Sequence, residues 1–229
     1  MITLNDFFDK IYCINLDSRP DRYKLAINEF SRWGVDVERI SGIDGNLIQQ
    51  NNRFIGKSGA YGLLLTHIEI LKNALENRYK NILILEDDVE FIKDFNEKFS
   101  EKILMLPDNW DLLYIGGNNV FSRGKFQLIS GDENFVITHE NYKTLNHEIC
   151  TTTWTQCAHS LGINSKFYEI LLNEINDNMN IPIDTIHCKL QQKKCKAYTF
   201  IPSLVLQRPS FSDIEGCYVD YNKNDANGF

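Results

Sequence analysis

Short apolar runs alternate with stretches of helical periodicity through the first half of the chain. The apolar runs predict strands at residues 10–16, 35–40, 82–85 and 112–115. Between them, apolar positions three or four residues apart predict helices that begin near Pro20, Ser58 and Phe95. Gly34 and Pro107 end the first and the last of these helices. This alternation predicts an α/β fold with a mostly parallel central sheet flanked by helices.

The pattern changes after Gly117, where an excursion that could cover a site begins. The elements predicted from there on are short strands at residues 126–129 and 135–137, a strand region at 151–163, a helix capped at Asn164 or Ser165, a shorter helix that begins at Pro182, and a last strand at 197–201. Residues 1–221 are expected to form one domain, and residues 222–229 a polar tail.

Composition narrows the class of protein. The 229 residues are 43% hydrophobic and 12% aromatic, which is too apolar for a disordered chain. Acidic residues outnumber basic ones by 31 to 24, a balance that argues against non-specific nucleic-acid binding. No apolar run approaches the roughly 20 residues of a membrane span, and the first residues do not resemble a signal peptide. The six cysteines form no Cys-x-x-Cys pair, so we expect reduced thiols in a cytoplasmic protein, with peripheral membrane attachment left open.

Three acidic residues, Glu86, Asp87 and Asp88, follow the buried strand at residues 82–85 directly. Ligands of open α/β sheets bind at this carboxyl end of the strands. Adjacent carboxylates repel one another, so a divalent cation among them is one interpretation and a solvated acidic turn is the other. In an extended segment Glu86 and Asp88 would share a side, with Asp87 pointing away. Asp88 is the strongest candidate metal ligand, and Glu86 would bind the metal, a nearby water or a ribose.

Several separate motifs resemble glycosyltransferase family 25, the lipooligosaccharide and procollagen galactosyltransferase group. They are Ile14-Asn15-Leu16-Asp17-Ser18-Arg19-Pro20-Asp21-Arg22, residues 59–67 with Thr66 in place of the usual serine before His67, Leu85-Glu86-Asp87-Asp88-Val89, Trp110-Asp111-Leu112-Leu113-Tyr114-Ile115-Gly116, Pro182-Ile183-Asp184, and Ser210-Phe211-Ser212-Asp213-Ile214. Each motif is weak by itself, but their order and spacing together are specific. Residues 153–159 depart from the tyrosine-rich strand of the family, so acceptor contacts could differ there.

The resemblance implies a nucleotide-diphospho-sugar transferase fold of the A type. It also implies transfer of a sugar, commonly galactose or glucose, from a UDP-sugar to a hydroxyl of a glycan or of a hydroxylysine-type protein acceptor, with inversion at the anomeric carbon. Mn²⁺ or Mg²⁺ would bridge the acidic residues and the donor pyrophosphate, which would otherwise repel one another. Residues 1 to about 117 would form the donor-binding half of the domain, and residues 118–221 the acceptor side.

The end of the first predicted strand supplies candidate donor-binding residues. Asn15 and Leu16 end the strand, and Arg19 and Arg22 follow at the start of the next helix. An asparagine can contact a uracil edge, and a guanidinium can bind a phosphate or stack on the base. The alternative makes both arginines ordinary surface charges of the helix. Asp87 belongs to the same predicted donor site.

His67, Gly59 and Gly62 come from the helix before the acidic residues. His67 is interpreted either as a donor-site residue or as a packed histidine of the core. The two glycines are expected to permit close packing of the helix, and close approach to the donor is the weaker alternative. His159 and Gln207 are candidates for a late metal ligand from the C-terminal half of the chain.

Inversion requires a general base on the acceptor side, and two aspartates are candidates. Asp184 follows Pro182 at a predicted helix start, where a cap is the alternative role. The helix N-terminus is expected to lower its pKa, which argues against a base. Asp213 is the second candidate, and its alternative role is also a cap or a loop hydrogen bond.

Two other kinds of protein could use the same acidic sheet edge or the same fold. Magnesium-dependent phosphoryl transfer would use the same acidic edge, but the chain has neither an Asp-x-Asp-x-Thr loop nor a glycine-rich phosphate loop with lysine. A nucleotide-sugar-binding or interaction module of the same fold with weak or lost catalysis is the second alternative. Metal-dependent hydrolysis of a UDP-sugar would separate the enzyme from this module.

Overall fold

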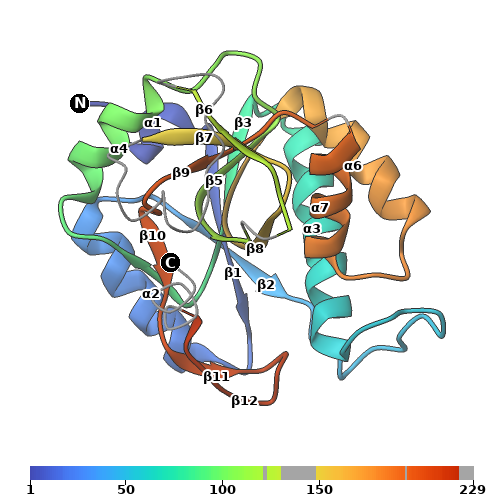
Figure 1. Cartoon of the computed structure of the whole chain (residues 1–229). Coiled ribbons are helices and arrows are strands. Elements are labelled where there is room, and N and C mark those ends of the chain that lie inside the picture. Colours follow the sequence, from blue (N-terminus) through green and yellow to red (C-terminus); the bar gives the residue numbers. More distant parts are fainter. Residues whose placement is uncertain (121–122, 130–147, 194, 222–229) are drawn as a thin grey trace.

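The protein has a central sheet with helices on both sides (Figure 1). The structure is a computed structural model that describes residues 1–120, 123–129, 148–193 and 195–221. The helices are α1 (Leu4–Phe7), α2 (Pro20–Trp33), α3 (Ser58–Glu76), α4 (Phe95–Ile103), α6 (Ser165–Asp177) and α7 (Ile183–Lys193). The strands are β1 (Lys10–Leu16), β2 (Glu38–Gly42), β3 (Asn81–Glu86), β4 (Val89–Phe91), β5 (Leu112–Asn119), β6 (Phe126–Leu128), β7 (Ile149–Thr152), β8 (Thr155–Asn164), β9 (Ala197–Phe200), β10 (Val205–Gln207), β11 (Ser210–Ser212) and β12 (Cys217–Val219).

The main sheet has the strand order β2-β1-β3-β8-β5-β9-β7-β6. Strand β1 pairs in parallel with β2 and β3, and β5 pairs in parallel with β9. Strand β8 lies between β3 and β5 and is antiparallel to both, while β7 is antiparallel to β9 and β6. Strands β1, β2, β3, β5, β6 and β9 therefore run in one direction, and only β7 and β8 run in the other. The predicted α/β fold with a mostly parallel sheet is confirmed.

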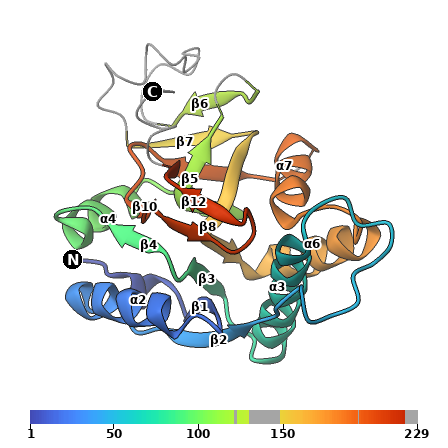
Figure 2. The same ribbon diagram turned by 90° about the horizontal axis from the view of Figure 1, so that it is seen from below.

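Each face of the sheet carries its own core, because successive strand residues point to opposite faces. In β3, Ile82 and Ile84 belong to the core on one face, whereas Leu83 and Leu85 belong to the core on the other. Helices α3, α6 and α7 cover the first face, and α2 and α4 cover the second (Figure 2). Because both faces of β3 are covered, its residues 82–85 are all apolar, and Glu86 at its end marks the carboxyl edge of the sheet.

Helix α3 packs closely against the loop that follows β2. A Cβ atom on Gly62 would lie 2.0 Å from the carbonyl oxygen of Ile43. The hydroxyl of Thr66 accepts a hydrogen bond from the Ile43 N–H at 3.0 Å and donates one to the Gly62 carbonyl at 2.9 Å. A serine could make the same two bonds, which explains why threonine is tolerated here. The expectation of close packing at Gly62 is confirmed, and the contact fixes one wall of the cavity described below.

Gly62→Ala is expected to lower the free energy of unfolding by about 1–3 kcal/mol, because the new methyl group meets backbone that cannot rotate away. Urea denaturation measures the change. Gly59→Ala on the same helix is the matched control, since its Cβ first meets the Ile214 side chain at 3.0 Å, and a side chain can move. Equal stability of wild type and Gly62→Ala would contradict this account of the helix–loop contact.

The C-terminal region has more strands than the sequence predicts. Strand β9 is followed by β10, which pairs with β4, and by the β11–β12 hairpin. The strand predicted at residues 135–137 and the tail predicted at residues 222–229 lie outside the described residues. All six cysteines are free. Within the described part of the chain, no helix is long and apolar enough to cross a membrane.

Candidate functional site

A cavity of about 420 Å³ opens at the carboxyl ends of β1 and β3. Its walls come from the ends of these strands, the loop after β2, the N-termini of α3 and α7, and the β11–β12 hairpin. Of the residues proposed from the sequence, those that border it are Asn15, Leu16, Gly59, Arg22, Glu86, Asp87, Asp88, Asp184, Gln207 and Asp213. The fold thus brings together side chains that are up to about 200 positions apart in the chain.

The guanidinium of Arg22 lies among the acidic residues. Its Nη2 is 2.5 Å from Asp87 Oδ1 and 2.9 Å from Asp88 Oδ2. Both carboxylates are therefore turned toward this group. The expectation that Asp87 points away is therefore wrong, because β3 ends at Glu86 and the two aspartates form the turn into β4. In this structure the positive charge that offsets the acidic cluster is an arginine.

Asn15 holds Asp87 in place. Its Nδ2 donates to Asp87 Oδ2 at 2.7 Å and to the Arg19 carbonyl at 2.9 Å, and its Oδ1 accepts from Arg39 Nε at 2.9 Å. Contact between its amide and a uracil would require one of these bonds to break. Arg39 was not identified from the sequence. It lies in β2 and also pairs with Asp17 at 2.6 Å, and its position shows only once β1 and β2 pair.

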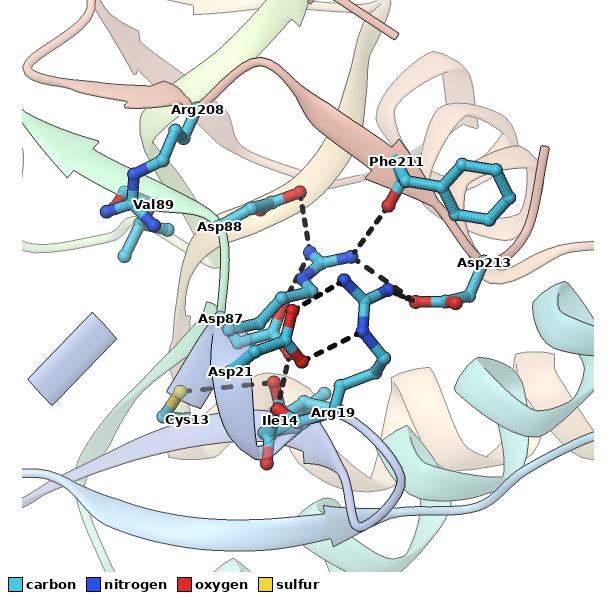
Figure 3. A network of polar contacts seen from close by, with 12 residues as sticks. Cys13, Ile14, Arg19, Asp21, Asp87, Asp88, Val89, Arg208, Phe211 and Asp213 are labelled. Carbon is cyan, nitrogen blue, oxygen red and sulfur yellow. Dashed lines mark hydrogen bonds and ion pairs between the residues drawn. The ribbon is translucent and has the colours of Figure 1, made fainter. Parts of the chain in front are cut away.

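The β11–β12 hairpin reaches the same cluster from the far end of the chain. Asp213 Oδ2 is 2.5 Å from Arg19 Nη1 and 3.5 Å from Arg22 Nη1. Arg22 Nη1 also donates to the Phe211 carbonyl at 3.4 Å. Figure 3 shows the carboxylate of Asp213 facing the guanidinium of Arg19. The carboxylate of Asp213 is thus held by two cations.

Two further carboxyl groups, those of the half-buried Glu86 and Asp184, border the cavity. Burial, together with the charges of Asp88 and Asp184, raises the pKa of Glu86 well above its ordinary value. Burial raises the pKa of Asp184 to about 6, although the backbone N–H of Cys157 donates to its carboxylate. Asp184 Oδ1 is buried without a hydrogen-bond partner. The expectation of a lowered pKa at the helix start is wrong, because burial outweighs the favourable helix terminus.

Cys157 is a residue that sequence reasoning missed. It lies in β8 with a backbone φ of 65°, a left-handed conformation that is uncommon for a residue other than glycine. Its backbone N–H is the donor that contacts Asp184. No feature of the local sequence signals this conformation, which coincides with the register shifts in the β5–β8 pairing.

The candidate histidines lie away from the cavity wall. His67 is fully buried beside His187, with ring centroids 5.9 Å apart, and burial lowers its pKa to about 4. His159 contacts the Val205 carbonyl at 3.2 Å through Nε2 and borders a separate cavity of about 10 Å³. Gln207 borders both cavities, so it is the late candidate that lies nearer to the acidic residues.

The oxygen ligands at this site suit a hard divalent cation. Asp88 Oδ1 is buried and has no partner, and Glu86 and Gln207 border the same cavity. No group of three or more His, Cys, Asp or Glu side chains within the described ranges is already arranged around a metal position. The donor atoms therefore fit Mn²⁺ or Mg²⁺ in type, while their present arrangement encloses Arg22.

The carboxyl edge of an α/β sheet is where such folds bind ligands, and the cavity at this edge combines acidic residues with Arg22. Residues 8–186, more than half of the chain, match the family described as glycosyltransferase family 25 (LPS biosynthesis protein). The chain belongs to this family, as the sequence motifs predicted.

Three relatives show how far the likeness extends. A glycosyltransferase 25 family member from Aedes aegypti is 28% identical over 161 residues, which cover 61% of this chain and 26% of the relative. Human procollagen galactosyltransferase 2 is 24% identical, covering 62% of this chain and 26% of that protein. A human protein named inactive glycosyltransferase 25 family member 3 is 23% identical, covering 62% and 27%. The chain thus spans about a quarter of the length of these relatives.

Proposed function

We propose that this protein is a glycosyltransferase that moves a hexose from a UDP-sugar to a hydroxyl group of a glycan or protein acceptor. The observation that carries the proposal is the cavity at the carboxyl edge of the sheet in a chain of family 25, where Arg22 contacts Asp87 and Asp88. Arg19 contacts Asp213, which borders this cavity. The relative named procollagen galactosyltransferase 2 supports galactose as the sugar. Six free thiols agree with the proposed cytoplasmic location.

The two arginines would bind the donor diphosphate. A guanidinium presents paired N–H groups that match phosphate oxygens, and Arg22 is already oriented by Asp87 and Asp88. Asn15 keeps Asp87 in position for this contact. The loop after β2, at residues 42–46, forms the opposite wall and would enclose the nucleoside.

Asp88 and Glu86 would hold a divalent cation, Mn²⁺ or Mg²⁺, beside the diphosphate. When bound, such an ion stabilises the negative charge of the departing UDP. The buried and unpartnered Oδ1 of Asp88 supports this assignment. Arg22 would keep its contact with Asp87 while Asp88 turns to the cation.

Asp184 is the preferred general base of an inverting reaction. Its carboxylate borders the cavity, one oxygen has no partner, and its pKa of about 6 lets it accept a proton near neutral pH. Asp213 is the weaker candidate, because the oxygen that it turns to the cavity is shared by Arg19 and Arg22. Asp184 would take the proton of the acceptor hydroxyl as that hydroxyl attacks the anomeric carbon.

UDP with Mn²⁺ is expected to raise the melting temperature by roughly 5–10 °C at about 100 times its dissociation constant, because it binds only the folded protein. Thermal denaturation with UDP and Mn²⁺, and with UDP and EDTA, measures the effect. Asp88→Asn should lose the part that depends on Mn²⁺ and keep its stability without ligand, since Arg22 still pairs with Asp87. Equal stabilisation by UDP in EDTA would refute the metal role, and no stabilisation at all would refute the donor site.

A binding module without turnover is the second candidate, and the relative named inactive favours it. Both candidates bind UDP, so binding cannot separate them. Hydrolysis of UDP-galactose in the presence of Mn²⁺ does, because slow transfer to water is a property of the enzyme alone. UDP binding without any release of galactose would favour the module.

A further inference from the structure

Arg19 and Arg22 each have carboxylate partners besides Asp213. Arg19 uses Nε and Nη2 for Asp21, both at 3.1 Å, and Arg22 uses Nη2 for Asp87 and Asp88. Each guanidinium is thus held by a carboxylate other than Asp213. In addition, Nη1 of each faces one and the same atom, Oδ2 of Asp213, at 2.5 and 3.5 Å, and Nη1 of Arg22 also donates to the Phe211 carbonyl.

This position of Asp213 Oδ2 suits a phosphate oxygen. Carboxylate and phosphate oxygens are bound by the same guanidinium geometry, and both carry negative charge. Removal of Asp213 would leave both arginines oriented, because their other edges keep their partners. A donor diphosphate could therefore replace the carboxylate without a rearrangement of α2.

The segment that carries Asp213 has a second attachment. The β11–β12 hairpin is also tied to the start of α3 through Lys57, whose Nζ is 2.6 Å from Glu215 Oε2 and 3.0 Å from the Glu215 carbonyl. Asp213 can leave the arginines while this attachment keeps the hairpin at the rim of the cavity. The hairpin then remains available to cover a bound donor.

We propose that Asp213 is a built-in competitor for the diphosphate of the donor, and that displacing it from Arg19 and Arg22 makes the site selective for nucleoside diphosphates. The inference rests on the proposed function, because it takes the donor to be a UDP-sugar. A ligand with two phosphate groups supplies oxygens for both Nη1 atoms. Uridine has no phosphate group and no negative charge, so it cannot displace Asp213.

Asp213→Asn is expected to lower the dissociation constant of UDP by roughly three- to tenfold, since a neutral amide competes less well for two cations. The affinity for uridine should stay within twofold. Isothermal titration calorimetry with UDP and with uridine, both in Mn²⁺, measures the two values. A merely structural loosening of the hairpin would change the affinities for UDP and for uridine alike. Asp213→Ser repeats the test if the first variant does not fold.

Asp17→Asn is the matched control. It also removes one carboxylate that pairs with an arginine at this sheet edge, but Asp17 contacts Arg39 and Ser41 and does not border the cavity. The affinity of Asp17→Asn for UDP should change less than twofold. This result would show that the tighter binding by Asp213→Asn comes from loss of the competing carboxylate and not from the change in net charge. Comparable tightening in this control would overturn the inference.

The remaining outcomes separate the two proposals. If UDP binds the wild type, and Asp213→Asn binds it equally or more weakly, the competitor is refuted and the donor site stands. If UDP binds only Asp213→Asn, the competitor is supported in its strongest form. If UDP binds neither protein, both the competitor and the proposed function are refuted.

Discussion

Asp184→Asn is expected to lower the rate of sugar transfer by about 10²–10⁴-fold, the usual contribution of a positioned general base. The affinity for UDP with Mn²⁺ should remain within about twofold, because the arginines and Asp88 that would bind the donor are untouched. Transfer assays with a UDP-hexose and calorimetry with UDP measure the two quantities. A loss of UDP affinity instead would assign Asp184 to the donor site.

The pH dependence gives an independent check on the same residue. The carboxylate must be ionised to act as a base, so transfer by the wild type should fall as the pH drops through about 6. The residual activity of Asp184→Asn should lack this step. Asp213→Asn is the comparison: normal transfer by Asp184→Asn together with a large loss in Asp213→Asn would make Asp213 the base.

As the pH rises, the contribution of Asp184 to the stability of the fold should fall, whereas the transfer activity should rise. The pKa of Asp184 is raised from 3.8 to about 6 on folding, so the folded protein binds this proton more tightly than the unfolded chain. The resulting stability is fully present below about pH 4 and is lost as the pH rises through about 6. Asparagine cannot ionise, so Asp184→Asn should be as stable as the wild type at pH 7.5, or more stable by up to about 3 kcal/mol. A collapse of the fold would contradict this.

Arg22→Met is expected to have the largest effect on stability, lowering the free energy of unfolding by about 3–5 kcal/mol at neutral pH. The side chains of Asp87 and Asp88 are only 9% and 11% exposed, and the substitution leaves both without their cation. Methionine keeps most of the apolar volume of the arginine stem, so the loss reports the charge. Urea denaturation measures it, and UDP binding should be lost as well.

Arg19→Met is the matched control for this prediction. Its partners Asp21 and Asp213 are 65% and 32% exposed, and Asp213 keeps its contact with Arg22, so the loss of each pair should cost less than about 1 kcal/mol. Mn²⁺ provides a second check, because a divalent cation should restore part of the stability of Arg22→Met if the carboxylates can bind one. Equal destabilisation by the two substitutions would show that Arg22 has no special role in the acidic cluster.

The elements that were predicted well are those that carry their own pattern. Strands β1 and β3 are apolar runs with both faces covered, and α2 and α3 are long enough to show a period. Strands β10, β11 and β12 have three residues each. Strand β10 pairs with β4, which is distant in the sequence, and β11 and β12 pair with each other across a tight turn. Three residues cannot display a period, so these strands depend on their partners rather than on their own sequence.

The site shows the same division. The acidic residues at the end of β3 mark the sheet edge without any knowledge of the fold. The residue that offsets their negative charge is Arg22. Local sequence cannot predict this contact, because Arg22 lies on α2, more than 60 positions earlier in the chain. The pKa of Asp184 depends on burial, which local sequence does not report, and the helix-terminus argument therefore gave the wrong direction.

The place of β8 in the sheet bears on how the chain acquires its fold during synthesis. Because β8 inserts between β3 and β5, these two strands, both from the first half of the chain, have no hydrogen bonds to one another. A nascent chain that has emerged only as far as Asn119 can pair β1 with β2 and β3, but it leaves one edge of β3 open. Such edges invite association between chains until they are covered. Synthesis must proceed to Asn164 before β8 covers this edge, and to Phe200 before β9 covers the other edge of β5. We therefore expect the protein to acquire its fold late, with its two halves folding together.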